Sequence, residues 1–159
     1  DLADCLVAMG ARIEGAGTHR IEIEGATAWR PATHDLIPDR VETGTYAIAA
    51  MITGGQLELV GARLEHLAAV AQVLEAAGAR IWPSDRGLVV DGSGPVQATD
   101  IKTEPYPGFP TDLQAQFMAL MTQADGASMI RETIFESRFM HVPELTRLGA
   151  DIRLQGSTA

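Results

Sequence analysis

Apolar residues recur at helical spacing at the start of the chain. Leu2, Leu6 and Met9 would lie on one face of a helix. Cys5 shares that face, and Gly10 is placed to end the helix. The residues that follow, GARIEGAGTHRIEIEG, predict two short strands joined by a turn. Because the chain begins inside a helical pattern, we expect it to be a piece of a longer protein.

The same context occurs three times. Stretches that begin GARIEG, GARIWP and GADIRL start at Gly10, Gly78 and Gly149, and each follows a helical pattern that a glycine ends. The intervals between them are nearly equal, so the pattern predicts a repeated supersecondary unit. The third copy breaks off where its second strand is expected to start.

The second copy contains one complete unit. A helical pattern begins after Asp39 and is stopped by two glycines at 54–55, and QLELVG then alternates as a strand. Residues 62–77 predict a second amphipathic helix. Its inward residues are expected to be Leu64, Leu67, Val70, Val73 and Leu74.

The third copy follows the same order. Asp112 heads a helical pattern, ASMIRET predicts a strand, and a helix is expected from Pro143 to Leu148. Each unit therefore runs helix, strand, helix, strand, strand, which places the chain in the layered α/β (α+β) class. We expect the units to pack around a shared core of helices, with residues 96–103 (VQATDIKT) adding one strand.

Composition narrows the possible partners. The 159 residues carry a formal net charge of −9, which argues against nucleic acid and against a membrane surface as partners. A local arginine can still hold an anionic ligand on an acidic protein. The single cysteine, Cys5, excludes an internal disulfide and a cysteine zinc cluster and fits a reducing cytoplasm. No apolar run reaches the length that spans a membrane.

The stretch PYPGFPTDLQAQF, residues 105–117, sets prolines directly before a helical pattern. Asp112 stands at the start of that pattern, as Asp39 does in the preceding unit. A carboxylate there accepts backbone N–H groups and meets the positive end of the helix dipole, so capping explains both residues. The alternative is that Asp112 is held at the helix start for proton chemistry. The residues alone favour capping.

Three blocks carry a resemblance to a known family: LIPDRVETGTYAIAA, PGFPTDLQAQFMAL and ETIFESRFMHVPELTRLGADI. In the same order, they resemble UDP-N-acetylglucosamine 1-carboxyvinyltransferase, the enolpyruvyl transferase that opens peptidoglycan synthesis. The resemblance covers essentially the whole chain. It implies two similar domains of repeated units with helices inside and sheets outside, an inside-out α/β barrel. Residues 1–36 would end the first domain, and residues 37–159 would form part of the second.

The resemblance also implies a reaction. The family transfers the enolpyruvyl group of phosphoenolpyruvate to the 3-hydroxyl of UDP-N-acetylglucosamine and releases phosphate, in the cleft between its domains. It uses no metal and no organic cofactor. The implied partners are these two substrates and the rest of the parent chain. The fragment alone would lack the family's reactive-cysteine loop, so we expect it to be inactive.

Matching PGFPTD assigns Asp112 to the family's catalytic aspartate, which contacts the sugar hydroxyl and is proposed as its general base. A carboxylate within about 3 Å can take the hydroxyl proton as the new bond forms. Thr111 is expected to touch the ligand as well, with an N-cap as its alternative role. Ile134 matches a position that binds the UDP-sugar largely through the backbone, with an apolar strand-end residue as the alternative.

Two arginines complete the predicted substrate-binding set. Arg138 matches an arginine near the interdomain cleft, where its planar fork can pair with a phosphate or carboxylate. A structural ion pair with Glu132 or Glu136 is equally compatible with the sequence. Arg40 has the same two possibilities, and the structural one is favoured.

Other residues and functions stay outside this assignment. His66 and His141 are interpreted as structural, and Cys5 as a buried, inert residue. The histidines, carboxylates and cysteine show no metal-ligand spacing. Two further functions remain open: a non-catalytic repeat module, which requires that Asp112 is only a cap, and the related transferase that acts on shikimate 3-phosphate.

Overall fold

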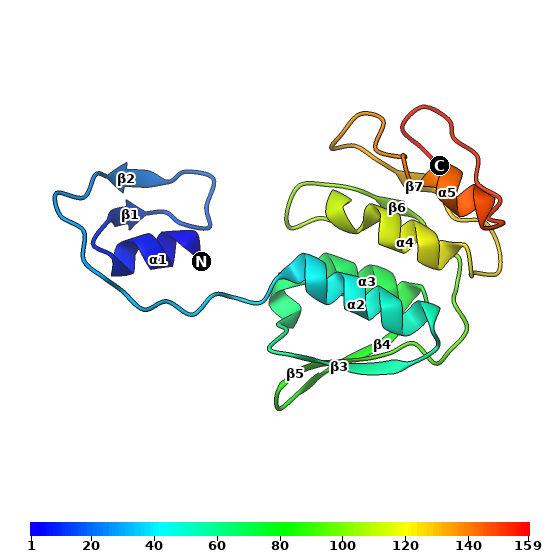
Figure 1. The fold of residues 1–159 in the computed structure, drawn as a ribbon, viewed down its shortest axis with the longest axis horizontal. Coiled ribbons are helices and arrows are strands. Elements are labelled where there is room, and N and C mark those ends of the chain that lie inside the picture. Colours follow the sequence, from blue (N-terminus) through cyan, green and yellow to red (C-terminus); the bar gives the residue numbers. More distant parts are fainter. The chain divides into compact units, whose positions relative to one another are not determined.

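The fold was obtained as a computed structural model that describes residues 1–159. Two compact units make up the chain, unit 1 (Asp1–Ile37) and unit 2 (Pro38–Ala159). Unit 1 holds α1 (Leu2–Ala8), β1 (Arg12–Glu14) and β2 (Glu22–Glu24), and the remaining elements belong to unit 2 (Figure 1). None of the helices is both long enough and apolar enough to cross a membrane.

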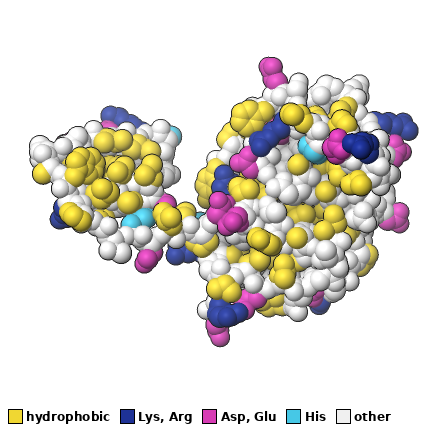
Figure 2. All heavy atoms as spheres, viewed as in Figure 1, with side chains coloured by type: hydrophobic (Ala, Val, Ile, Leu, Met, Phe, Trp, Pro, Cys, Tyr) yellow, Lys and Arg dark blue, Asp and Glu magenta, His cyan; other side chains and the backbone are white.

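Unit 1 is a short helix beside a two-stranded antiparallel ribbon, in which Ile13 lies opposite Ile23. No residue of α1 is fully buried. The prediction that Cys5 is buried was therefore wrong, since its side chain is only half-buried. A ribbon of two strands is too narrow to cover the apolar face of a helix. Figure 2 shows hydrophobic side chains gathered on the surface of this unit, and Trp29 is among its exposed residues.

The complete repeat in unit 2 has the predicted order of elements. They are α2 (Arg40–Ile52), β3 (Gln56–Val60), η1 (Leu64–His66), α3 (Ala68–Ala76), β4 (Arg80–Ser84) and β5 (Gly87–Asp91), where η denotes a 3₁₀ helix. The strands form one antiparallel sheet in the order β3-β5-β4, so the last strand lies in the middle. Leu57 and Ile81 flank Val90, which is buried under the helices.

The next repeat is less regular. It contains β6 (Ile101–Lys102), η2 (Thr111–Leu113), α4 (Gln114–Met121), β7 (Ile130–Arg131) and α5 (Val142–Arg147). β6 and β7 pair in parallel. The first strand expected after Gly149 does not form a regular ladder. Instead Ala159 and Ile130 exchange two backbone hydrogen bonds of 2.9 Å, at the point where the second strand was expected to start.

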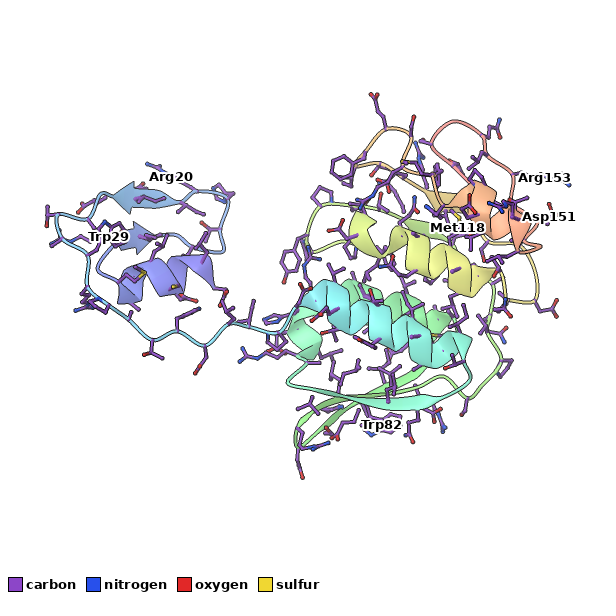
Figure 3. The ribbon with its side chains drawn as sticks, viewed as in Figure 1. Arg20, Trp29, Trp82, Met118, Asp151 and Arg153 are labelled. Atoms are coloured by element: carbon purple, nitrogen blue, oxygen red, sulfur yellow. The ribbon has the colours of Figure 1, made fainter.

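The three longer helices of unit 2 lie between its strands. Figure 1 shows α2, α3 and α4 between the three-stranded sheet and the β6–β7 pair. These helices and η2 supply four of the large apolar side chains that are almost fully buried: Leu74, Leu113, Phe117 and Leu120. Trp82 of β4 points away from the helices (Figure 3). Met118, Asp151 and Arg153, also labelled there, line an open hollow beside α4.

Three helices end in the same way, at a glycine followed by an alanine, and these three glycine joints confirm the predicted repeat. Gly10, Gly78 and Gly149 have φ angles of 112°, 107° and 103°, a left-handed region that favours glycine. In each joint the N–H of the following alanine donates to the carbonyl of a leucine in the preceding helix. The pairs are Ala11 with Leu6 at 2.9 Å, Ala79 with Leu74 at 2.9 Å, and Ala150 with Leu145 at 3.1 Å. Each helix thus ends in the same left-handed cap.

The helix predicted over residues 62–77 is interrupted. The backbone leaves helical geometry at Leu67 (φ −123°, ψ 10°), where η1 ends and α3 begins. Leu67 is buried, whereas Leu64, predicted to face inward, is exposed. Leu64 and Leu67 lie on different sides because the backbone turns at Leu67, where the 3₁₀ geometry that would align side chains three residues apart ends.

Candidate functional site

Asp39 is a helix cap. Its Oδ1 accepts hydrogen bonds from the backbone N–H groups of Val41 (2.6 Å) and Glu42 (3.2 Å), both in the first turn of α2. These N–H groups have no partner within the helix, so the carboxylate satisfies them and also meets the positive end of the dipole. The predicted capping role is confirmed for this residue.

Asp112 is not a cap. It is the middle residue of η2, and neither η2 nor α4 has a side-chain cap. Its Oδ1 accepts instead from Nη2 of Arg138 at 2.9 Å, and the two side chains are 51% and 40% exposed. The carboxylate therefore projects from the turn toward solvent, where a ligand can reach it.

A close contact between helices fixes the turn that carries Asp112. Leu113, the next residue, is 0% exposed, and its side chain packs on Gly44 of α2. A Cβ atom on Gly44 would lie 2.3 Å from Cδ1 of Leu113, closer than two carbon atoms can approach. Leu113 points inward against the bare backbone of α2, and Asp112 consequently points outward.

Glu132, which directly follows β7, is the buried centre of this region. Only 2% of the residue is exposed. Its Oε1 accepts from the Thr103 hydroxyl (2.8 Å) and from the N–H groups of Ile134 (2.8 Å) and Phe135 (3.2 Å). Its Oε2 accepts from the Thr111 hydroxyl (2.8 Å) and from Nε2 of Gln114 (3.4 Å).

These hydrogen bonds keep Glu132 ionised. Burial by itself would raise the pKa of the carboxyl group. The hydrogen bonds from the Ile134 N–H, the hydroxyls of Thr103 and Thr111 and the Phe135 N–H outweigh burial, so the pKa lies below its usual range.

Thr111 connects this buried carboxylate to the exposed pair. Its hydroxyl donates to Glu132 and accepts from Nη1 of Arg138 at 2.9 Å. The alternative role as an N-cap was wrong, because the capping position of η2 is Pro110. Thr111, Asp112 and Arg138 thus form one hydrogen-bonded group.

Arg138 has different partners from those expected. One arm of its guanidinium binds Thr111, the other binds Asp112, and the group lies 5.2 Å from the ring centre of Phe135. The structural alternative, an ion pair with Glu132 or Glu136, does not form. Both oxygens of Glu132 are occupied by hydroxyl and N–H donors, which leaves Asp112 as the carboxylate within reach.

The other two predicted residues, Ile134 and Arg40, make no hydrogen bond to Thr111, Asp112 or Arg138. Ile134 is half-buried, and its N–H is already held by Glu132. Arg40 makes no ion pair, so the favoured structural pairing was wrong. Its guanidinium lies 5.3 Å from the ring centre of Tyr106, beside a small hollow that Pro107 also lines. A cation without a carboxylate partner remains available to an anion.

His141 lies close to the site and stays neutral. Burial lowers its pKa, and the positive charge of Arg138 lowers it further. Its Nε2 is buried without a hydrogen-bond partner. No group of three or more histidine, cysteine or acidic side chains is arranged to hold a metal ion.

Sequence reasoning missed the central role of Glu132, which it treated only as a partner for Arg138. It also missed Gln114, whose amide donates to Glu132 and to the carbonyl of Arg138 at 3.3 Å. A glutamate at the end of a short apolar strand, followed by a turn, is a weak signal for such a centre. Its donors come from distant parts of the chain.

Comparison with known proteins gives a consistent result. The family model described as EPSP synthase (3-phosphoshikimate 1-carboxyvinyltransferase) matches residues 1–158. The chain is 72% identical over 159 residues to UDP-N-acetylglucosamine 1-carboxyvinyltransferase 2 of Mesorhizobium japonicum. It is 58% identical over 159 residues to UDP-N-acetylglucosamine 1-carboxyvinyltransferase of Granulibacter bethesdensis. Each match covers 100% of this chain but only 38% of the relative.

Solved structures with similar folds confirm the predicted fold class. The enolpyruvyl transferase NikO from Streptomyces tendae superposes with a TM-score of 0.85 at 27% identity, over 99% of this chain and 38% of its own. EPSP synthase from Acinetobacter baumannii superposes with a TM-score of 0.55 at 15% identity, over 98% of this chain and 37% of its own. The second likeness concerns the fold alone.

Proposed function

The chain belongs to the EPSP synthase (3-phosphoshikimate 1-carboxyvinyltransferase) family, and on that basis we propose that it is the central part of a UDP-N-acetylglucosamine enolpyruvyl transferase. The parent enzyme would move the enolpyruvyl group of phosphoenolpyruvate to the 3-hydroxyl of UDP-N-acetylglucosamine and release phosphate. Relatives at 72% and 58% identity bear the corresponding name. Residues 1–36 would then end one domain and residues 37–159 begin the next. We place the enzyme in the cytoplasm, at the start of peptidoglycan synthesis.

One observation carries this proposal. Asp112 stands at a helix start without capping it, and its carboxylate is exposed and oriented by Arg138. A group that merely stabilised the helix would bond to the backbone, as Asp39 does. An exposed carboxylate fixed by a guanidinium instead suits contact with a ligand.

The proposed chemistry balances with Asp112 as general base. The sugar hydroxyl oxygen bonds to C2 of phosphoenolpyruvate while its proton passes to the Asp112 carboxylate, and the C2–C3 double bond opens as C3 takes up a proton. C3 then loses a proton, the double bond re-forms, and the bond between C2 and the phosphate oxygen breaks to release phosphate. Such base catalysis typically contributes about 10²–10⁴-fold to the rate. Arg40, which lacks a carboxylate partner, is assigned to an anionic group of the substrates. Thr111 is assigned to the sugar, and Ile134 to the UDP-sugar through its backbone carbonyl, because its N–H is held by Glu132.

The experiment is a calorimetric titration of UDP-N-acetylglucosamine into the full-length protein and its Asp112→Ala variant, with phosphate release recorded for both. We expect the variant to bind the nucleotide sugar but to lose turnover. Asp39→Ala is the matched control, since it removes a carboxylate from the equivalent place in the preceding repeat and should keep turnover. Equal turnover in the wild type and the Asp112 variant would exclude the assignment.

The family description makes shikimate 3-phosphate the acceptor to test beside UDP-N-acetylglucosamine. We expect phosphate release with the nucleotide sugar and none with shikimate 3-phosphate, given the identity to the named relatives. The opposite preference would reassign the acceptor. If neither compound binds, a non-catalytic repeat module becomes the better description.

Residues 1–159 alone are expected to lack activity, because the chain spans only 38% of the length of these relatives. Enolpyruvyl transfer by the isolated chain would contradict this expectation.

A further inference from the structure

Glu132 is a buried carboxylate that joins three separate segments. Its hydrogen-bond donors come from the residue after β6 (Thr103), from η2 (Thr111) and from the loop after β7 (Ile134 and Phe135). An ionised carboxylate can only accept hydrogen bonds, so it fixes the direction of every bond that it makes. A charge so deeply buried is costly unless it is fully paired.

The direction of one of these bonds matters for the site. A threonine hydroxyl has one proton, and Thr111 gives it to Glu132. Only oxygen lone pairs then remain for Arg138, whose Nη1 donates to Thr111 at 2.9 Å. With that arm held, the other arm of the fork meets Oδ1 of Asp112 at 2.9 Å. The four residues form a directed chain from the interior to the exposed carboxylate.

We propose that Glu132 is a positioning residue of the transferase site, which acts through the Thr111 hydroxyl to orient Arg138 and thereby the carboxylate of Asp112. This inference rests on the proposed function. Glu132 itself is shielded from substrate, so its effect reaches the reacting atoms only through Thr111 and Arg138. Small errors in the placement of a catalytic group cost rate rather than binding.

The first test is Glu132→Gln in the full-length protein. Glutamine keeps the size of the side chain but replaces one acceptor oxygen by an NH₂ donor. In one orientation this NH₂ group faces the Thr111 hydroxyl and the Gln114 amide. In the other it faces the Thr103 hydroxyl and two backbone N–H groups, so in either case donors meet a donor. We expect kcat for phosphate release to fall by about 10–100-fold, with KM for UDP-N-acetylglucosamine changed by less than about threefold.

Three threonine variants separate positioning from general stability. Thr111→Val has nearly the same shape but no hydroxyl, and it should lower kcat to a similar degree. Thr111→Ser retains the hydroxyl and should restore kcat. Thr103→Val is the matched control, because Thr103 donates to the other oxygen of the same carboxylate and does not touch Arg138. It should lower stability and leave kcat within about threefold of the wild type.

A double-mutant cycle tests whether Glu132 and Thr111 act in series. If Glu132 acts through the Thr111 hydroxyl, adding Glu132→Gln to Thr111→Val should change kcat little further. Effects that multiply, or a loss of kcat in Thr103→Val as large as in Thr111→Val, would overturn the proposal in favour of a merely structural role.

A readout that does not require turnover keeps this inference separate from the proposed function. The two Nη groups of Arg138 give distinct NMR signals when both arms are held, and these signals can be assigned by their absence in Arg138→Lys. We expect them to merge through faster rotation in Glu132→Gln and Thr111→Val, but not in Thr103→Val. If the wild type proves inactive as a transferase while this pattern holds, the function fails and the positioning role stands. Unchanged Arg138 signals in Glu132→Gln would refute the positioning role.

Discussion

The starts of α2 and of the η2–α4 segment occupy equivalent places in consecutive repeats, yet their aspartates do different things. The capping position of α2 is Asp39 (φ −69°, ψ 119°), whereas that of η2 is Pro110, with nearly the same backbone (φ −74°, ψ 137°). Asp112 is therefore two residues further into its turn than Asp39. A displacement of two residues moves a carboxylate from above the helix end to its outer side, and so from capping to possible contact with a ligand.

The residues that follow the two aspartates also differ in how far they are buried. Leu113 is buried against Gly44, whereas Arg40 stays partly exposed beside Tyr106. One turn is thus anchored through an apolar side chain, and the other through its cap. A repeat can thus preserve the path of the chain while it changes how each helix start is held.

The largest expected effect is on turnover. In the full-length protein, Asp112→Asn should lower kcat by about 10²–10⁴-fold, because an amide cannot accept the hydroxyl proton. Asp39→Asn should leave kcat nearly unchanged, since asparagine is also a good cap. Phosphate release measured at saturating substrates compares the two. Similar losses in both variants would erase the functional distinction between the two helix starts.

The next largest effect concerns the anchor of the Asp112 turn. Gly44→Ala would force a methyl group into Leu113, and overpacking of this kind costs about 1–3 kcal/mol. Most of this range exceeds the roughly 1 kcal/mol that alanine gains over glycine within a helix, and Leu113 is fully buried. Urea unfolding should therefore show a net loss of stability, partly recovered when Leu113→Val is added.

Gly25→Ala is the control for that measurement, since a Cβ there would meet no atom within 4 Å. A Gly44→Ala protein as stable as the wild type would show that the contact between α2 and Leu113 is loose.

A smaller effect distinguishes the two aspartates by stability. Asp39→Ala should lower the free energy of unfolding by about 1 kcal/mol, the usual value of an N-cap. Asp112→Ala should change it by less than about 0.5 kcal/mol, because exposed ion pairs contribute little. Thermal unfolding of both variants gives the comparison, and the opposite order would identify Asp112 as the structural residue.

The smallest effect is a pH dependence of the stability, which comes from Glu132, the buried carboxylate bonded to the turn that carries Asp112. The pKa of Glu132 is lowered in the folded protein, so between that value and the unfolded value of about 4.3 the unfolded chain binds a proton that the folded one does not. The contribution of Glu132 to stability is present above that range and is lost as the pH falls through it.

Urea unfolding at a series of pH values checks this sign. The stability advantage of the wild type over Glu132→Gln should shrink on acidification below about pH 5. His141, whose pKa burial and Arg138 also lower, should cost stability in the same direction as the pH falls below about 6.5. An advantage that grows on acidification would mean that Glu132 is protonated in the native state.

Features that depend on neighbouring residues could be predicted from the sequence. The order of elements in the complete repeat and the three glycine joints follow from apolar spacing and from the preference of glycine for positive φ. The capping role of Asp39 followed in the same way, because a cap involves only the next few backbone groups.

Features that depend on distant contacts could not be predicted. Whether Asp112 caps a helix is decided by a tight turn packed on Gly44, far away in the sequence. Periodicity also gave no warning of the break at Leu67 or of the half-buried Cys5. Glu132 gathers donors from three segments, and only the folded chain brings them to one carboxylate.

The three glycine joints have a consequence for how such a protein can diverge. Each joint is specified by one glycine and one backbone hydrogen bond, so substitutions elsewhere in a unit leave the exit path of its helix intact. After duplication, one copy of a helix start can retain an ordinary cap while the other drifts by a residue or two and acquires new chemistry. A repeated unit therefore contains a second copy of each helix start, and selection can change that copy while the first keeps its structural role.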